Sequence, residues 1–128
     1  MLEEQKSLLK QAKDSLDVAR NILRDGYPGF SAARAYYAMF YAVEALFLEQ
    51  EMAFSKHAGI ITAFSQYYIK TGIFDRKYST FLREGFELRM IGDYGKLRSV
   101  TIAEAEAQVE RASELLAIIE QRLEGDLK

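Results

Sequence analysis

The sequence contains no cysteine, one histidine and one proline. Without cysteine the chain cannot form disulfide bonds, use a thiol nucleophile or bind zinc through thiolates. A single histidine also excludes a histidine-rich metal site. We therefore expect no metal centre of these kinds and no cofactor. A magnesium ion held by carboxylates alone stays compatible with the composition.

The sequence also lacks a long uninterrupted apolar run. Its most apolar stretch, residues 30–48, is broken by Arg34 and Glu44, and the amino-terminal residues carry charges of both signs. These features argue against a membrane span and against a secretion signal. We expect a cytoplasmic protein without membrane partners. The length of 128 residues suits one core, and we predict a single domain over residues 1–128.

The charges are unevenly distributed, although the net charge is only -2. Residues 70–98 hold seven basic and four acidic side chains, a local charge of +3. Residues 99–128 hold three basic and seven acidic side chains, a local charge of -4. The simpler interpretation is a solvated helix face, and the alternative is a basic patch that attracts an anionic partner.

Hydrophobic residues recur at helical spacing along the whole chain. Apolar stripes predict a first helix over residues 2–23 and a last helix over residues 102–123. Residues 30–48 predict a central helix that other elements surround, because it is apolar on nearly every side. Two further helices are expected after Ser55 and Asp75, which can cap them. We therefore predict an all-α fold, an antiparallel up-and-down bundle of four to five helices.

Four polar side chains follow one side of the predicted central helix. Their spacings of three, four and three residues place them on one helix face (Arg34, Tyr37, Tyr41 and Glu44). Burying such groups without partners costs about 1–3 kcal/mol each. This face must therefore find partners inside the fold or open onto a cleft or subunit interface. Arg34 and Glu44 are too far apart to pair within one helix, and Glu44 opposite Arg89 is one pairing to consider.

A second polar cluster lies in the sequence FELRMIGDYG, near the end of the fourth predicted helix. Arg89 and Asp93 are four residues apart, so they can form an ion pair on one helix face. Two glycines bracket Asp93 and Tyr94, which is typical of a helix end. Gly85 is unfavourable in a helix by about 1 kcal/mol relative to alanine, so it predicts a close approach of two helices.

Aromatic residues are more numerous than a thin bundle easily encloses. We therefore expect that some apolar surface is shared with a second subunit. The residues behind this expectation are Phe40, Phe47, Phe64, Tyr67, Phe81 and Phe86.

Four motifs follow one another along the chain: AARAYYAMFYAVEALFL, FSKHAG, a phenylalanine-rich helix and FELRMIGDYG. In this order and spacing they resemble the HEPN family, small all-helical domains of bacteria and archaea, and especially its short stand-alone members. The resemblance covers about residues 12–117. It implies a four-to-five-helix bundle that is usually a homodimer. It also implies a minimal nucleotidyltransferase as a partner, with which such domains behave as toxin and antitoxin.

Many HEPN domains are metal-independent RNases whose motif is an arginine, four to six residues, and then a histidine, with two subunits placing their motifs at a shared cleft. Here Arg89 occupies the arginine position, but Tyr94, Gly95 and Lys96 stand where the histidine would be, and no histidine follows. Arginine can hold a phosphate with its two-pronged fork, but it cannot carry protons as histidine does. The departure argues against efficient RNA cleavage.

Two functional hypotheses follow from the residues and the resemblance. The first is a dimeric module that binds nucleotide or RNA phosphate through Arg89, with Arg34 and Glu44 as further binding residues, or that engages a nucleotidyltransferase. The second is an RNase with an altered active site, in which Arg89 and Asp93 act with His57 or Tyr94. A purely structural role in oligomerisation is a third possibility.

Each candidate residue also has a structural interpretation. Arg89 and Asp93 can simply be an ion pair that finishes a helix. His57, in the family signature Ser-Lys-His, can pack at a helix start and bond to a neighbouring helix, or it can reach the cleft of Arg89 and replace the missing proton carrier. Tyr94 can cap the core, contact a phosphate, or correspond to the tyrosine that the nucleotidyltransferase modifies in related toxins.

Overall fold

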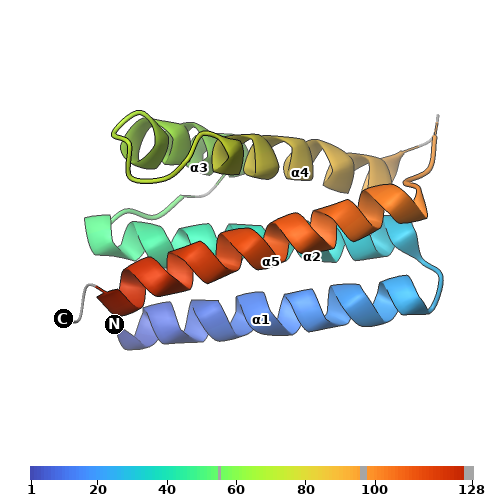
Figure 1. Cartoon of the computed structure of the whole chain (residues 1–128), viewed down its shortest axis with the longest axis horizontal. Coiled ribbons are helices and arrows are strands. Elements are labelled where there is room, and N and C mark those ends of the chain that lie inside the picture. The colour runs from blue at the N-terminus through green and yellow to red at the C-terminus, as the bar shows by residue number, and fades with distance from the viewer. Residues whose placement is uncertain (55, 96–97, 126–128) are drawn as a thin grey trace.

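The computed structural model describes residues 1–54, 56–95 and 98–125, and these residues form helices without any strand. The α-helices are α1 (Glu3–Arg24), α2 (Pro28–Phe47), α3 (His57–Phe64), α4 (Lys77–Tyr94) and α5 (Ile102–Gly125). Figure 1 shows α1, α2, α4 and α5 running side by side, with α3 at the end of α4. The predicted all-α bundle is confirmed.

The ends of the helices agree with most of the predicted signals. The Asp75 carboxylate accepts a 2.8 Å hydrogen bond from the backbone N–H of Lys77, at the start of α4. After α3, the chain continues through a π-helical turn, η2 (Ser65–Ile69), and then bends at Gly72, whose φ of +80° lies in the left-handed region. The predicted cap Ser55 lies outside the described residues.

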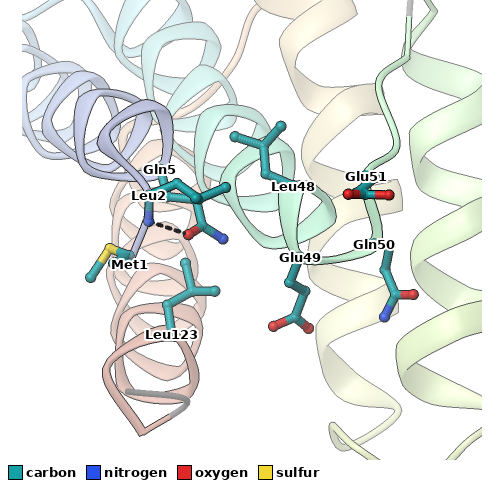
Figure 2. A pocket seen from close by; sticks show the side chains of 8 residues that line it. All are labelled: Met1, Leu2, Gln5, Leu48, Glu49, Gln50, Glu51 and Leu123. Carbon is teal, nitrogen blue, oxygen red and sulfur yellow. Dashed lines mark hydrogen bonds between the residues drawn. The ribbon is translucent and has the colours of Figure 1, made fainter.

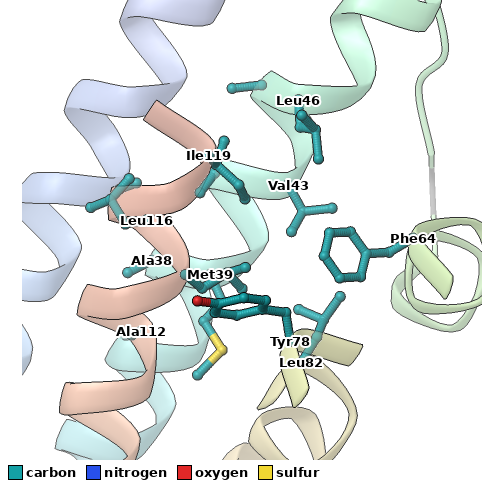
Figure 3. Packing of buried hydrophobic residues seen from close by; sticks show 14 of the residues in the cluster. Ala38, Met39, Val43, Leu46, Phe64, Tyr78, Leu82, Ala112, Leu116 and Ile119 are labelled. Carbon is teal, nitrogen blue, oxygen red and sulfur yellow. The ribbon is translucent and has the colours of Figure 1, made fainter. Parts of the chain in front are cut away.

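The hydrophobic core surrounds α2, which packs against α1, α4 and α5. In Figure 3, Met39 and Val43 of α2 lie among Phe64 of α3, Leu82 of α4 and Ile119 of α5. All five side chains are fully buried. Burying a side chain of this size stabilises the fold by about 1.5–3 kcal/mol, so α2 holds the bundle together.

The aromatic residues of the predicted set differ in their burial. Phe47 and Phe64 are fully buried within one protomer. The other phenylalanines of the set pack half-buried against the same core (Phe40, Phe81 and Phe86). Tyr67 is 38% exposed, so the expectation that some aromatic surface is shared with a second subunit stays a prediction. The most exposed aromatic side chains are instead Phe30 (61%) and Tyr94 (62%).

One side of α2 is open. Its polar residues are only half-buried, unlike the rest of the helix (Arg34, Tyr37, Tyr41 and Glu44). Arg34 contacts Ser15 of α1, and Tyr37 contacts Arg89 of α4, so this polar side runs between α1 and α4. This agrees with the expectation that the polar face either finds partners inside the fold or opens onto a cleft, because the neighbouring helices cover it only in part.

Two absences bear on the sequence expectations. Within the described ranges, no helix combines the length and apolarity needed to cross a bilayer. In the same part of the chain, no three acidic, histidine or cysteine side chains gather as they would around a metal ion.

Small residues bring α4 close to its neighbours. Gln108 of α5 donates hydrogen bonds to the carbonyl oxygens of Gly85 (3.0 Å) and Ala32 (3.1 Å). A Cβ atom on Gly85 would lie 3.2 Å from the Met39 side chain, so the predicted close approach is confirmed. Further along α4, the backbone of Gly92 rests against the backbone of Gly29 at the start of α2. These contacts fix where the last turns of α4 meet α2.

We expect Gly92→Ala to lower the free energy of unfolding by about 1–3 kcal/mol, as overpacking does in well-packed interiors. The added methyl group would overlap the carbonyl oxygen of Gly29, so the two backbones must separate. Urea denaturation measures the change. Gly59→Ala is the control, because its Cβ would meet only Phe54 at an ordinary 3.6 Å. Equal stability of the two variants would contradict the close contact.

Candidate functional site

Arg89 projects from the last turns of α4 toward the open side of α2. Its Nη2 donates a 2.6 Å hydrogen bond to the hydroxyl of Tyr37. Its Nε lies 3.0 Å from Oδ2 of Asp93, which confirms the predicted ion pair. The Nε–H does not point at that oxygen and has no hydrogen-bond acceptor, so this contact is electrostatic. Only 12% of the Arg89 side chain is exposed.

The Arg89 guanidinium keeps unused hydrogen-bonding capacity. It carries five N–H bonds. Tyr37 accepts one of them, and the sulfur of Met90, 3.4 Å from Nη1, is a weak acceptor for a second. The buried Nε–H group has no hydrogen-bond acceptor among the residues that the structure describes. Unsatisfied donors on a partly buried charge favour an anionic ligand that supplies two oxygens.

Aromatic rings and a second arginine surround this guanidinium. The Arg89 Cζ atom lies 5.2 Å from the centre of the Tyr37 ring and 5.6 Å from that of Tyr94. Arg34 lies 4.8 Å from the Tyr37 ring, and its Nε donates a 2.9 Å hydrogen bond to Ser15. At such distances a cation is attracted to the face of the ring. Tyr37 therefore brings both predicted phosphate-binding arginines to one place.

Glu44 does not join this cluster. Within the described part of the chain it makes no hydrogen bond and no ion pair, and partial burial raises the pKa of its carboxyl group above the ordinary value. The considered pairing of Glu44 with Arg89 is wrong for a single protomer. Asp93, one turn away on α4, is the carboxylate that Arg89 contacts.

His57 is the first residue of α3 and lies beside the arginine cluster. Its Nδ1 is 2.9 Å from the hydroxyl of Tyr36 on α2, which confirms the predicted bond to a neighbouring helix. Its ring packs against Phe40 and stacks on Phe86. Burial and the charge of Arg89 both lower the pKa of His57. His57 therefore packs at a helix start, as one interpretation predicted, and its pKa also responds to the charge of Arg89.

Tyr36 occupies one of the two ring nitrogens of His57. The Tyr36 side chain is fully buried, and burial raises its pKa far above the ordinary value. Its neutral hydroxyl shares a hydrogen bond with Nδ1, whichever of the two groups donates. Only Nε2 is then left to contact a ligand. When the hydroxyl donates to Nδ1, Nε2 carries the hydrogen and His57 has no free nitrogen to act as a base.

Sequence reasoning missed the contribution of Tyr36 and understated that of Tyr37. Tyr36 lies in an apolar run, where nothing distinguishes it from an ordinary core residue. Tyr37 lies on the polar side of α2, and that position in the sequence could have indicated its contact with a polar group. Tyr94 is 62% exposed beside Arg89, so it does not cap the core.

A hollow of about 570 Å³ lies away from these residues, between the start of α1, the 3₁₀ turn η1 (Leu48–Gln50) and the end of α5. Figure 2 shows its lining, which includes Gln5, Glu49 and Leu123. Glu49 accepts hydrogen bonds from Tyr68 and Arg122 and so belongs to a structural network. None of the predicted site residues lines this hollow.

Comparison with known proteins identifies the family. The family description that matches is the HEPN domain, over residues 5–122. The chain belongs to the HEPN family. This HEPN chain is 35% identical over 119 residues to a "UPF0332 protein" of Thermotoga maritima, covering 93% of the chain and 89% of that relative.

Two further similarities extend this result. "Putative toxin MJ0142" of Methanocaldococcus jannaschii is 32% identical to the HEPN chain over 103 residues, which are 80% of the chain and 70% of that protein. The crystal structure of TT1696 from Thermus thermophilus superposes with a TM-score of 0.80, covering 94% of the chain and 98% of the other. At 18% identity, the second similarity shows the shared fold alone.

We expect the single imidazole of this HEPN chain to titrate below its ordinary pKa of 6.5. The unfolded chain then binds more protons than the folded chain, so His57 makes the protein less stable as the pH falls through 6.5. Arg89→Ala should raise the pKa of His57 above its wild-type value but not back to 6.5, because burial still lowers it. NMR titration measures it. Arg83→Ala removes an exposed charge from the same helix, and an equal rise in this control would refute the coupling.

Proposed function

We propose that this HEPN chain is a binding and regulatory module that holds a phosphate group of a nucleotide or RNA at Arg89, in a cleft shared by two copies of the chain. The supporting observation is the state of the Arg89 side chain. Tyr37 and Asp93 fix it in place, yet its buried Nε–H group has no hydrogen-bond acceptor in the described structure. A positioned arginine with free donors matches a phosphate, which offers paired oxygens.

We extend the proposal to a toxin–antitoxin pair in the cytoplasm, with a minimal nucleotidyltransferase as the protein partner. The support is similarity to a relative named "Putative toxin MJ0142" and to a second named "Putative toxin MJ0605", together with the family to which the chain belongs. Tyr94 is well exposed, so its hydroxyl is accessible to a partner enzyme that modifies tyrosine.

A metal-independent RNase with an altered site is the second candidate, and the position of His57 favours it. The histidine from α3 lies close enough to Arg89 for the charge to lower its pKa, although the family motif has no histidine after the arginine. Cleavage needs a base to take the proton of the 2′-hydroxyl group. We propose that the Tyr36 hydroxyl donates to Nδ1, so that Nε2 carries the hydrogen and the arrangement favours phosphate binding over cleavage.

We expect Arg89→Ala to weaken binding of a fluorescently labelled single-stranded RNA by about tenfold or more, since a hydrogen bond to a charged group contributes about 1.5–3 kcal/mol. Arg89→Lys should give an intermediate affinity, because lysine keeps the charge but loses the planar fork. Fluorescence anisotropy at fixed low salt measures both.

The matched control for RNA binding is Arg83→Ala, which removes the same charge from an exposed position on α4. Its affinity should stay close to that of the wild type. If the two alanine variants lose affinity equally, the binding depends on overall charge and the site at Arg89 is refuted.

We expect no cleavage of tRNA or mixed RNA by the purified chain in the presence of a chelator, beyond that of the Arg89→Ala variant. The reason is that in the proposed tautomer His57, the only histidine, presents a hydrogen-bond donor and no base. Gel analysis of the RNA gives the result. Cleavage that disappears in both Arg89→Ala and a folded His57→Ala variant would instead establish the RNase alternative.

A further inference from the structure

Met90 is the methionine of this chain that solvent reaches most easily. Its side chain is 40% exposed, and the other three methionines are fully or partly buried (Met1, Met39 and Met52). The chain contains no cysteine, so no thiol competes with methionine for an oxidant. An exposed thioether reacts more readily than a buried one, because the oxidant has to reach the sulfur. Mild oxidation of this chain is therefore directed to Met90.

The Met90 sulfur lies against the guanidinium of the candidate site. Its Sδ atom accepts a hydrogen bond from Nη1 of Arg89 at a distance of 3.4 Å. A thioether is a weak acceptor, so Nη1 can exchange this contact for an oxygen of a phosphate. The other terminal nitrogen, Nη2, donates its 2.6 Å hydrogen bond to the hydroxyl of Tyr37. Nη1 is therefore the terminal nitrogen that is held less firmly.

Oxidation changes this weak acceptor into a stronger one. With hydrogen peroxide as the oxidant, a lone pair of Sδ forms an S–O bond while the O–O bond of the peroxide breaks. The second oxygen leaves as water and takes both hydrogens, so the sulfur is oxidised by two electrons and the peroxide is reduced. The product is methionine sulfoxide, a polar side chain. Because the methionine chain is unbranched and flexible, the new oxygen can turn toward Nη1 without moving the helix.

We propose that Met90 is an oxidation site that regulates the candidate site, because its sulfoxide oxygen accepts a hydrogen bond from Nη1 of Arg89 and competes with the phosphate. This inference rests on the proposed function, since it concerns the regulation of the phosphate site. In the oxidised chain, Tyr37 and the sulfoxide engage one terminal nitrogen each. The guanidinium then offers fewer N–H groups to the paired oxygens of a phosphate, although its charge is unchanged.

The fold tolerates this modification because Met90 lies outside the hydrophobic core of the described residues. A sulfoxide oxygen at this exposed position of α4 stays in contact with water. The same oxygen on the fully buried Met39 would be a polar group without a partner in an apolar environment, which is unfavourable. Oxidation of Met90 therefore changes the candidate site and leaves the bundle folded.

Binding of RNA before and after oxidation tests the inference. The chain is treated with a limited amount of hydrogen peroxide, catalase removes the excess, and peptide mapping by mass spectrometry locates the added oxygen. We expect Met90 to be oxidised ahead of Met39 and Met52. The affinity for labelled single-stranded RNA, measured by fluorescence anisotropy, should fall about fivefold, which corresponds to one net hydrogen bond. Circular dichroism checks that the oxidised chain is folded.

Two methionine variants are the matched controls, because leucine replaces methionine at similar volume and has no sulfur. Each variant is compared with its own untreated protein. Peroxide should leave the RNA affinity of Met90→Leu unchanged, although its other methionines remain. Peroxide should weaken binding by Met52→Leu as much as it weakens binding by the wild type. An equal loss in treated wild type and treated Met90→Leu would assign the effect to another methionine and overturn the inference.

The outcomes separate this inference from the proposed function. If Met90 is oxidised without loss of affinity, while Arg89→Ala weakens binding, the inference is overturned and the phosphate site stands. If Arg89→Ala binds RNA as well as the wild type, the phosphate site is refuted, and NMR of the Arg89 side chain tests the contact by itself. Slower solvent exchange of the Arg89 N–H groups in the oxidised chain supports the contact with the sulfoxide, and equal exchange overturns it.

Discussion

The hydrogen bond from Arg89 to Tyr37 connects the end of α4 to the middle of α2, and the candidate site depends on it. A 2.6 Å contact between a charged donor and a half-buried hydroxyl contributes about 1.5–3 kcal/mol. The geometry of this hydrogen bond depends on two other contacts of α4. Gly92 allows the backbone of α4 to contact α2 at Gly29, and Gln108 donates a hydrogen bond to the carbonyl oxygen of Gly85. Small residues and one glutamine therefore place the guanidinium within reach of the tyrosine.

The same guanidinium controls the chemistry of the residues around it. Burial and the positive charge of Arg89 both keep His57 neutral by lowering its pKa. The Tyr36 hydroxyl engages Nδ1 of the neutral ring, so Nε2 is the nitrogen left for a ligand. In the proposed tautomer arginine and histidine both present N–H groups, while the nearby Asp93 carboxylate balances part of the Arg89 charge. A site with this composition recognises an anion more readily than it transfers a proton.

Local relationships in this chain were predictable, and contacts between helices were not. Helical spacing predicted the bundle, and the four-residue separation of Arg89 and Asp93 predicted their ion pair, because both follow from the geometry of one helix. Arg89 and Tyr37 are 52 residues apart, and their contact depends on how α4 packs on α2. The proposed contact of Glu44 with Arg89 failed for the same reason. Counting aromatic residues could not show which of them are buried, because the burial of Phe47 and Phe64 depends on how the helices pack.

The central helix has two different sides, and this difference connects the fold to the proposed function. One side carries Met39 and Val43 into the core, whereas the other leaves Glu44 half-buried and, among the described residues, without a partner. In the proposed cleft between two copies, each copy would place its own Arg89 side chain. Two bare guanidinium groups there would repel each other, but each lies 3.0 Å from its own Asp93, which moderates the repulsion. A bound phosphate would compete with Asp93 for Nε of Arg89. The Asp93 carboxylate therefore offsets part of the Arg89 charge without blocking an incoming anion.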